Sequence, residues 1–299
     1  YGGANSPKQE GCHFDQGDSQ SRMIVATRKA LDAAGLQDVL VCGSDETSTE
    51  TATKSLKALS SEALAALGRV DSHSYNYPGA YNDASLTDLH KAALDAGKNL
   101  WMSEVDKGGT AGANAGEMGA PLELALRITK DLNGLQASAW IMWDIIDTHR
   151  SSEGYNGNKD WGAPNPEGGY WGIATADHDE QLILPWKKYY GFGQFTRYIR
   201  PGYRQLPLES NYTLAFYSEA ERTLVVVATQ PDAFDGCLAL DVSSFAALPQ
   251  TAQVVRTSGA LQDGENLAAV QLTLAAKGKT LYLPLKANSI TTFVFEGME

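Results

Sequence analysis

A carboxylate, Glu104, ends an apolar segment that begins at Leu100 and includes Trp101 and Met102. This pattern predicts a short buried strand, and the glycines after Lys107 predict a turn away from it. In a barrel of parallel strands the carboxyl ends form the active-site face, so an acid there is placed for catalysis. A strand-end Glu held by Arg or Lys is equally common, and this segment alone favours that structural role.

Polar and aromatic residues also follow the other predicted strands. They are Asp45 and Glu46, then His73, Tyr75 and Tyr77, and finally Trp140, Trp143 and Asp144. Flat aromatic faces stack on sugar rings while carboxylates bond the hydroxyls, so this mixture indicates a carbohydrate site. We expect Trp143 to be a sugar platform at the mouth of the site and Trp140 to belong to the core.

The segment 149–172 is rich in Gly, Asn and Pro and is predicted to be one long loop. Its aromatic residues are Tyr155, Trp161, Tyr170 and Trp171. Loops of this length are usually functional, and we expect Trp171 to contact substrate.

Hydrolysis of a glycosidic bond with retention requires two carboxyl groups about 5–5.5 Å apart, one as nucleophile and one as acid and then base. Glu104 fits the first role. Glu10 and Glu46 are candidates for the second, because both are expected on loops that reach the same end of the barrel. For Glu46, a sugar-binding or solvated carboxylate is the simpler interpretation.

The 299-residue chain has 24 Lys and Arg against 36 Asp and Glu, a formal net charge of −12. This acidic balance argues against nucleic acid or an anionic membrane surface as a partner. No apolar run approaches the roughly 18 residues of a membrane span, and no leader sequence is present. Because the first residue is Tyr1 rather than Met, we expect that a leader or a larger piece precedes it.

Neither the histidines nor the cysteines are spaced as metal ligands, so no metal or other cofactor is expected. Cys12, Cys42 and Cys237 are far apart and odd in number, which predicts buried free thiols rather than a disulfide framework.

Strands and helices are predicted to alternate through the first two thirds of the chain. The expected strands lie at 39–43, 70–75, 100–106 and 138–144, and the expected helices at 23–34, 56–67, 86–96, 121–132 and 186–199. Alternation with short links is typical of a parallel α/β architecture with right-handed crossovers. Met23 and the small residues at its helical spacing are expected on the buried face of the first helix.

From about Leu206 the pattern changes to short runs of period two. The runs are 212–217, 223–228, 238–242, 252–256, 268–274, 280–284 and 290–295. Such runs, separated by turn residues, predict an antiparallel β-sandwich. We therefore expect two domains, residues 1–204 and 205–299.

Several motifs together resemble glycoside hydrolase family 30. They are Trp101–Glu104, His73–Tyr75, Trp140–Asp144, the helix 187–202 and the tail 288–293, and the segment Lys8–Phe14 is most similar to the endo-β-1,6-galactanase branch. The resemblance implies a (β/α)8 barrel with an attached β-sandwich, and retaining hydrolysis of β-linked sugars with Glu104 as nucleophile. In that family the tyrosine matching Tyr75 orients the nucleophile, and the tryptophan matching Trp143 lines the first sugar subsite. His13, His73 and Asp144 complete the expected substrate-binding set.

One family motif, the Asn-Glu-Pro that carries the acid/base at the end of the fourth barrel strand, does not occur in this sequence. The chain therefore corresponds to about four βα units, the C-terminal half of a TIM-type barrel, followed by the sandwich. We expect a secreted or periplasmic hydrolase of β-1,6-galactan or β-galactosides. The alternatives are a carbohydrate-binding remnant that has lost its acid, and a piece of a longer gene product.

The missing strands also lead to a prediction about assembly. A half-barrel leaves two unpaired strand edges and an uncovered inner face, on which we expect Val39, Val41, Leu100, Met102 and Ile141. Two copies related by a twofold axis would restore eight strands, so we expect a homodimer in which Glu10 or Glu46 of one subunit approaches Glu104 of the other.

Overall fold

The computed structural model describes residues 14–15, 17–75, 83–107, 116–155, 158–161, 172–246 and 251–299. Glu10, His13, Tyr77 and Trp171 lie outside these residues. The chain forms two compact units, one of Tyr1–Val105 with Gly134–Met142 and one of Asp106–Asn133 with Trp143–Glu299. No helix of the described residues is long and apolar enough to cross a membrane.

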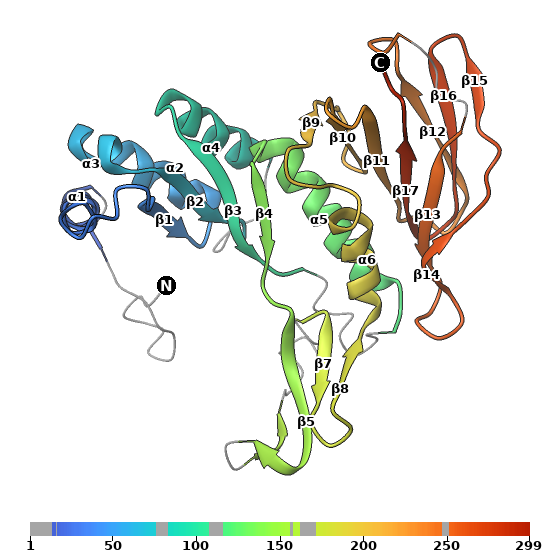
Figure 1. Cartoon of the computed structure of the whole chain (residues 1–299), viewed down its shortest axis with the longest axis horizontal. Helices are drawn as coiled ribbons and strands as arrows, with labels where there is room; N and C mark the ends of the chain where they lie inside the picture. The colour runs from blue at the N-terminus through green and yellow to red at the C-terminus, as the bar shows by residue number, and fades with distance from the viewer. Residues whose placement is uncertain are drawn as a thin grey trace. The chain divides into compact units, whose positions relative to one another are not determined.

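The first unit is built on a four-stranded parallel sheet in the order β1-β2-β3-β4 (Figure 1). The strands are β1 (Cys42–Glu46), β2 (Arg69–His73), β3 (Asn99–Val105) and β4 (Ala139–Met142), and the helices are α1 (Asp18–Ala33), α2 (Thr49–Ala58), α3 (Ser61–Ala66) and α4 (Asp83–Asp95). The predicted alternation of strand and helix is confirmed here, because α2 and α3 link β1 to β2 and α4 links β2 to β3.

The two faces of this sheet differ in chemistry. Leu100 and Met102 of β3 are buried, whereas Trp101 and Ser103 are only half-buried. The guanidinium of Arg69 lies 3.4 Å from the centre of the Trp101 ring and donates to both carboxylate oxygens of Asp71, at 2.6 and 2.8 Å.

The prediction that Val41, Leu100 and Met102 lie on an uncovered face is wrong, because all three side chains are buried. Val39 and Ile141 are exposed as expected.

Local packing changes three of the predicted elements. The strand expected at 39–43 begins only at Cys42, and Val39 and Leu40 before it are exposed. The helix expected at 56–67 is two helices, because the backbone is extended at Leu59 and the Ser60 hydroxyl accepts from the Ala63 amide to cap α3. The buried face predicted for α1 is also wrong: Met23 is 52% exposed, and Ser21 and Ile24 are the buried residues.

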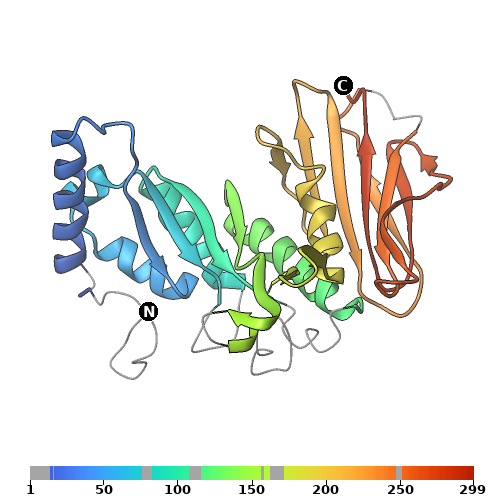
Figure 2. The ribbon, with the colours of Figure 1, turned by 60° about the horizontal axis from the view of Figure 1, so that its bottom comes forward.

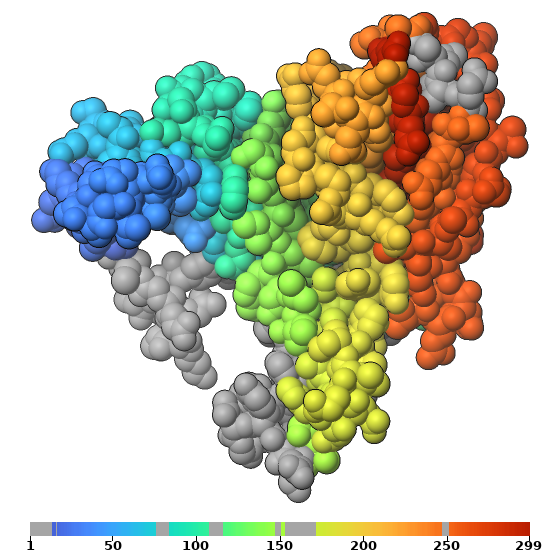
Figure 3. Space-filling model, in the orientation of Figure 1, coloured from blue at the N-terminus to red at the C-terminus, as the bar shows by residue number. Residues whose placement is uncertain are grey.

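The second unit contains a small sheet in the order β6-β5-β7-β8, which forms the yellow-green part of the surface in Figure 3. Its strands are β5 (Ile146–Tyr155), β6 (Asn158–Trp161), β7 (Ala174–Asp177) and β8 (Leu182–Pro185). The segment expected to be one long loop at 149–172 therefore carries most of β5 and all of β6. Strand pairing prevails over the loop-like composition, since β5 pairs with both β6 and β7.

Two further antiparallel sheets follow along the chain in the second unit, and Figures 1 and 2 show them as adjacent layers. One has the order β14-β13-β17-β11-β10-β9 and the other β12-β16-β15. The strands are β9 (Arg204–Leu206), β10 (Thr213–Ser218), β11 (Thr223–Gln230), β12 (Gly236–Asp241), β13 (Gln253–Ser258), β14 (Glu265–Ala269), β15 (Ala275–Lys277), β16 (Thr280–Leu285) and β17 (Ser289–Phe295). Val226 and Phe293 of the first sheet share one apolar core with Leu240 and Leu283 of the second.

The two cysteines in the described residues are free but not buried as predicted. Cys42 of β1 and Cys237 of β12 are both exposed. Cys237 alternates with buried positions on an edge of the three-stranded sheet, so its side chain faces away from the core.

Two consecutive lysines at the start of α6 (Lys187–Thr196) hold this unit together. The fully buried Lys187 donates from Nζ to the main-chain carbonyl oxygens of Ser258 (3.1 Å), Ala260 (3.3 Å) and Glu265 (2.9 Å) and to the side-chain oxygen of Asn266 (2.6 Å). Lys188 pairs with Asp106, which comes directly after β3, at 2.7 Å. The helix α5 (Gly119–Leu135) lies between Asp106 and α6 in the chain, where a helix was expected at 121–132.

Candidate active site

Five polar side chains meet at the carboxyl ends of β1, β2 and β3. They are Asp45, His73, Tyr75, Ser103 and Glu104, which we call the Glu104 cluster. The Tyr75 hydroxyl donates to Oε1 of Glu104 at 3.2 Å, and Nδ1 of His73 lies 3.6 Å from the same oxygen. Sequence reasoning expected Glu104, His73 and Tyr75 near one another, and the structure brings them together.

The other nitrogen of the His73 ring faces a second carboxylate. Its Nε2 lies 3.3 Å from Oδ1 of Asp45, and the Ser103 hydroxyl donates to that same oxygen at 2.5 Å. The hydrogen bond from His73 and, to a smaller extent, the hydrogen bond from Ser103 hold the pKa of Asp45 below its ordinary value. Asp45 is therefore an ionised acceptor at neutral pH.

Two irregularities in the strand register bring these side chains to one place. Ser44 pairs with Asp71 and Glu46 with Ser72, so Asp45 is the extra residue of β1. Ser103 is the extra residue of β3 between pairs made by Met102 and Glu104. Successive residues of a regular strand point to opposite faces, and a bulge removes that constraint. The bulge explains how the neighbours Ser103 and Glu104 both reach the Glu104 cluster.

Burial and backbone contacts hold the cluster in place. His73 is 3% exposed, and the ring of Tyr75 stands edge-on to it at a centroid distance of 5.8 Å. The Tyr75 amide donates to the carbonyl of Thr47, which joins the end of β2 to the segment before α2. The Glu104 side chain is 31% exposed, so its carboxylate is anchored on one side and accessible on the other.

The structure places Glu46, one candidate acid/base, differently from its neighbour Asp45. Oε1 of Glu46 accepts from the hydroxyl of Ser55, a fully buried residue of α2, at 2.6 Å. Asp45 is thus the acid of β1 whose carboxylate contacts His73. The role predicted for Glu46 stays a prediction, and Glu10 lies outside the described residues.

The aromatic residues after β4 belong to the second compact unit. Trp143 is 39% exposed and Asp144 is half-buried, and their role as substrate contacts stays a prediction. Trp140, expected in the core, is half-buried. The other predicted substrate contacts, His13 and Trp171, lie outside the described residues.

Sequence reasoning missed Ser103 and gave Asp45 no role of its own. Asp45 carried a signal, because it follows a predicted strand as His73 and Glu104 do. Ser103 carried none, since simple alternation sends it to the face opposite Glu104.

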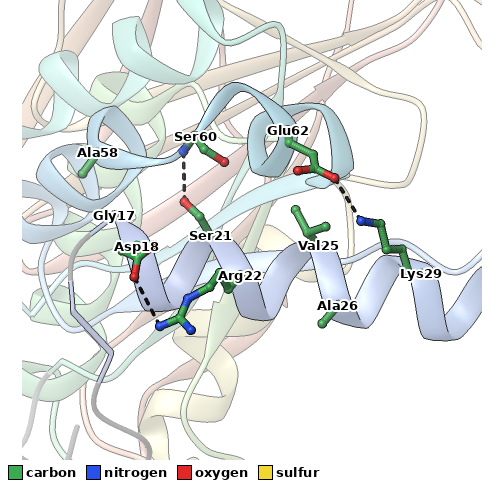
Figure 4. Close-up of a pocket in the computed structure, with 10 residues that line it drawn as sticks. All are labelled: Gly17, Asp18, Ser21, Arg22, Val25, Ala26, Lys29, Ala58, Ser60 and Glu62. Atoms are coloured by element: carbon green, nitrogen blue, oxygen red, sulfur yellow. Dashed lines mark hydrogen bonds and ion pairs between the residues drawn. The ribbon is translucent and has the colours of Figure 1, made fainter.

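A groove of about 560 Å³ lies between α1 and the segment that leads into α3 (Figure 4). It is lined by Gly17, Asp18, Ser21, Arg22, Val25, Ala26, Lys29, Ala58, Ser60 and Glu62. Its charged side chains pair with one another, Asp18 with Arg22 at 3.2 Å and Lys29 with Glu62 at 3.1 Å. No residue of the Glu104 cluster lines this groove.

Proteins similar to this chain include a galactanase and xylanases. No family model matches the chain. Over 220 residues the chain is 29% identical to an endo-β-1,6-galactanase from Hypocrea rufa, a match that covers 73% of this chain. The fold is that of a family 30 subfamily 8 xylanase from Clostridium acetobutylicum, at 17% identity and a TM-score of 0.68 over 97% of this chain. The predicted resemblance to glycoside hydrolase family 30 is confirmed.

A second solved structure with this fold is a conserved exported protein from Bacteroides fragilis, with 18% identity and a TM-score of 0.59 over 92% of this chain. The galactanase and the xylanase are longer than this chain. It spans 39% of the galactanase and 63% of the xylanase.

Proposed function

We propose that this chain carries the nucleophile of a retaining glycoside hydrolase that acts on β-linked galactose-type sugars, either β-1,6-galactan or β-galactosides. The observation that carries the proposal is the hydrogen bond from the Tyr75 hydroxyl to Oε1 of Glu104 at 3.2 Å, with Nδ1 of His73 3.6 Å from the same oxygen. The hydrogen bond orients one carboxylate oxygen at a strand end while the side chain keeps 31% of its surface exposed. A nucleophile needs that combination of fixed orientation and access.

In the proposed reaction an oxygen of Glu104 attacks the anomeric carbon, and the bond to the leaving-group oxygen breaks as that oxygen receives a proton. The product is a glycosyl ester of Glu104. Water then attacks the same carbon, loses a proton to the acid/base group, and releases Glu104 as a carboxylate. The anchored Tyr75 hydroxyl reduces the motion of the attacking carboxylate in both steps.

The identity of the group that donates the proton is a separate proposal. Asp45 is the other carboxylate in contact with His73, and its lowered pKa suits an anchor rather than an acid. Glu10 and Glu46 stay the candidates within the chain. A second subunit, or a segment corresponding to the additional length of the relatives, is the external alternative.

The parallel and antiparallel sheets also support a proposal about the architecture of the domains. We propose that the four parallel strands are half of a (β/α)8 barrel within a domain of residues 1–204, and that residues 205–299 form a β-sandwich. A second copy that pairs with the free edges of β1 and β4 would complete eight strands. The exposed Val39 and Ile141, beside or on those edge strands, support such a contact.

Substrate is proposed to lie over the exposed side of Glu104, with His73 and Tyr75 as contacts. Trp143 and Asp144 of the second unit, and His13 and Trp171 from segments outside the described residues, stay proposed substrate contacts. A secreted or periplasmic location suits a polysaccharide substrate, and one structural relative is named as an exported protein.

Glu104→Gln tests the function, because it keeps the shape of the side chain and removes its charge. We expect wild type to hydrolyse an aryl β-galactoside or β-1,6-galactan and the variant to lose turnover while its fold is retained. A 2-fluoro-galactoside with a good leaving group should add one glycosyl unit to wild type, detected by intact mass, and none to the variant. Glu123→Gln is the control, since this side chain pairs with Lys107 on the surface of the second unit.

Equal turnover by wild type and Glu104→Gln would exclude Glu104 as nucleophile. Binding of galactan by wild type without turnover and without a covalent adduct would instead favour a carbohydrate-binding remnant.

A further inference from the structure

Asp45 has a positive φ angle of 60°. This is the left-handed region, which residues with a side chain rarely adopt, although Asp does so more often than most. Asp45 is also the extra residue of β1 in the pairing with β2. Residues in such conformations persist when their surroundings hold them there, and they gather at functional sites. The carboxylate of Asp45 makes two contacts with other side chains.

Those contacts come from two neighbouring strands. Oδ1 of Asp45 receives the Ser103 hydroxyl from β3 at 2.5 Å and lies 3.3 Å from Nε2 of His73 at the end of β2. Ser103 is itself the extra residue of β3. Two bulged residues, 58 positions apart in the chain, thus meet across the strand that carries His73.

The contact with Asp45 decides which nitrogen of His73 carries a proton. An ionised carboxylate only accepts hydrogen bonds, so Nε2 must be the donor. Nδ1 is then the nitrogen that faces Glu104, at 3.6 Å. With the ring 3% exposed, solvent has little part in its orientation.

We propose that Asp45 is a positioning residue for the nucleophile: through Nε2 it fixes the tautomer and orientation of His73 beside Glu104, and Ser103 fixes the Asp45 carboxylate. The effect on catalysis rests on the proposed function, whereas the tautomer of His73 does not. Carboxylates orient imidazoles in the same way in catalytic triads and beside metal-bound histidines, and at metal sites their loss lowers metal affinity or activity by about 10- to 100-fold.

The test compares Asp45→Ala, Asp45→Asn and Ser103→Ala in the full chain. The first removes the acceptor, the second keeps a neutral acceptor, and the third leaves the carboxylate without its hydroxyl partner. Asp95→Asn is the matched control, because Asp95 pairs with Lys91 on the exposed surface of α4. Two measurements are made on each: the 15N shifts of the His73 ring, assigned with His73→Gln, and kcat and KM on an aryl β-galactoside.

In wild type we expect His73 to show a protonated Nε2. Asp45→Ala should shift the proton population toward Nδ1 and lower kcat by roughly tenfold or more, with KM within about twofold. Asp45→Asn and Ser103→Ala should give smaller changes in the same direction, and Asp95→Asn none. A merely structural role would not change the tautomer in a variant whose near-UV circular dichroism is native.

The proposal is overturned if Asp45→Ala keeps the wild-type ring shifts and the wild-type kcat. If Asp45→Ala does not fold, wild-type shifts and kcat in both Asp45→Asn and Ser103→Ala overturn it. If wild type has no turnover, the proposed function fails, and the ring shifts alone decide whether Asp45 sets the tautomer.

Discussion

The Ser103 hydroxyl donates to the Asp45 carboxylate at 2.5 Å across β2. Each residue is a bulge in its own strand, and the hydrogen bond joins the strand ends on both sides of His73. The nucleophile candidate Glu104 comes directly after Ser103, so the position of Glu104 depends on how β1 and β2 are paired, and not on β3 alone.

Tyr75→Phe should lower kcat by about 10- to 100-fold with little change in folding. The variant removes one hydrogen bond to a charged acceptor, which is worth about 1.5–3 kcal/mol, and leaves the ring packed against His73. Steady-state kinetics on an aryl β-galactoside measure the change. Tyr212→Phe, on the exposed surface of the second unit, is the control. Equal kcat in Tyr75→Phe and Tyr212→Phe would show that the hydroxyl does not orient the nucleophile.

Trp143→Ala should raise KM for oligosaccharides by roughly tenfold, because a stacking contact with a sugar ring is worth about 1–2 kcal/mol. The 39% exposed ring has surface available for such a contact. Phe234→Ala removes another exposed aromatic ring from the second unit and should leave KM unchanged. An unchanged KM in the Trp143 variant would remove Trp143 from the substrate site.

Glu265→Gln should destabilise the second unit in a way that depends on pH. The Arg256 guanidinium donates to both carboxylate oxygens, at 2.6 and 2.7 Å, and lowers the pKa of Glu265 to about 2 from 4.5. A lowered pKa in the folded state stabilises the protein above the unfolded value, so the contribution is complete above about pH 4.5 and is lost as pH falls toward 2. At neutral pH it amounts to roughly 3 kcal/mol.

Urea unfolding of wild type and Glu265→Gln at pH 7, 4 and 3 measures this contribution. We expect the difference in unfolding free energy to shrink with falling pH. Glu62→Gln, in which the lost carboxylate is 69% exposed and pairs with Lys29, should cost less than about 1 kcal/mol at every pH. A difference in unfolding free energy that stays constant from pH 7 to pH 3 would contradict the assignment of this stabilisation to the charge of Glu265.

Lys187→Met should lower the free energy of unfolding by about 2–4 kcal/mol, because four oxygens lose their donor in a buried place. Chemical denaturation measures the loss. Lys54→Met is the matched control, since Lys54 is 61% exposed and pairs only with Glu50 one helical turn away. Similar losses in the two variants would mean that the Lys187 contacts add nothing beyond those of a surface pair.

Sedimentation velocity at low micromolar concentration tests the proposed assembly. A homodimer that completes the barrel should sediment with twice the 32.1 kDa mass of the chain. Ile141→Lys places a charge on the exposed edge strand and should yield monomers, whereas Leu94→Lys, on the exposed surface of α4, should not. A folded wild-type monomer at this concentration would refute the homodimer.

Local periodicity in the sequence determined the order of strands and helices and the place of Glu104 at the end of β3. Period two and the helical period depend on residues within a few positions of one another, so most strands of the C-terminal sheets could also be predicted. The run expected at 268–274 overlaps only the end of β14, and β9 and β15 were not predicted. Predictions from periodicity failed where contacts between distant residues determine the local structure. The backbone of Leu59 divides a continuous helical pattern, and the pairing of β5 with β6 and β7 makes strands of a loop-like sequence.

Some members of the Glu104 cluster could be predicted from the sequence, and others could not. His73, Tyr75 and Glu104 could be predicted, because each follows an apolar run and parallel strands bring such positions to one edge. The partnership of Asp45 and Ser103 was decided only by tertiary structure. A bulge arises from hydrogen bonding between strands that are distant in sequence, and it changes which side chains share a face. No periodicity within β1 or β3 records that register, because the residues that determine it lie in the neighbouring strand.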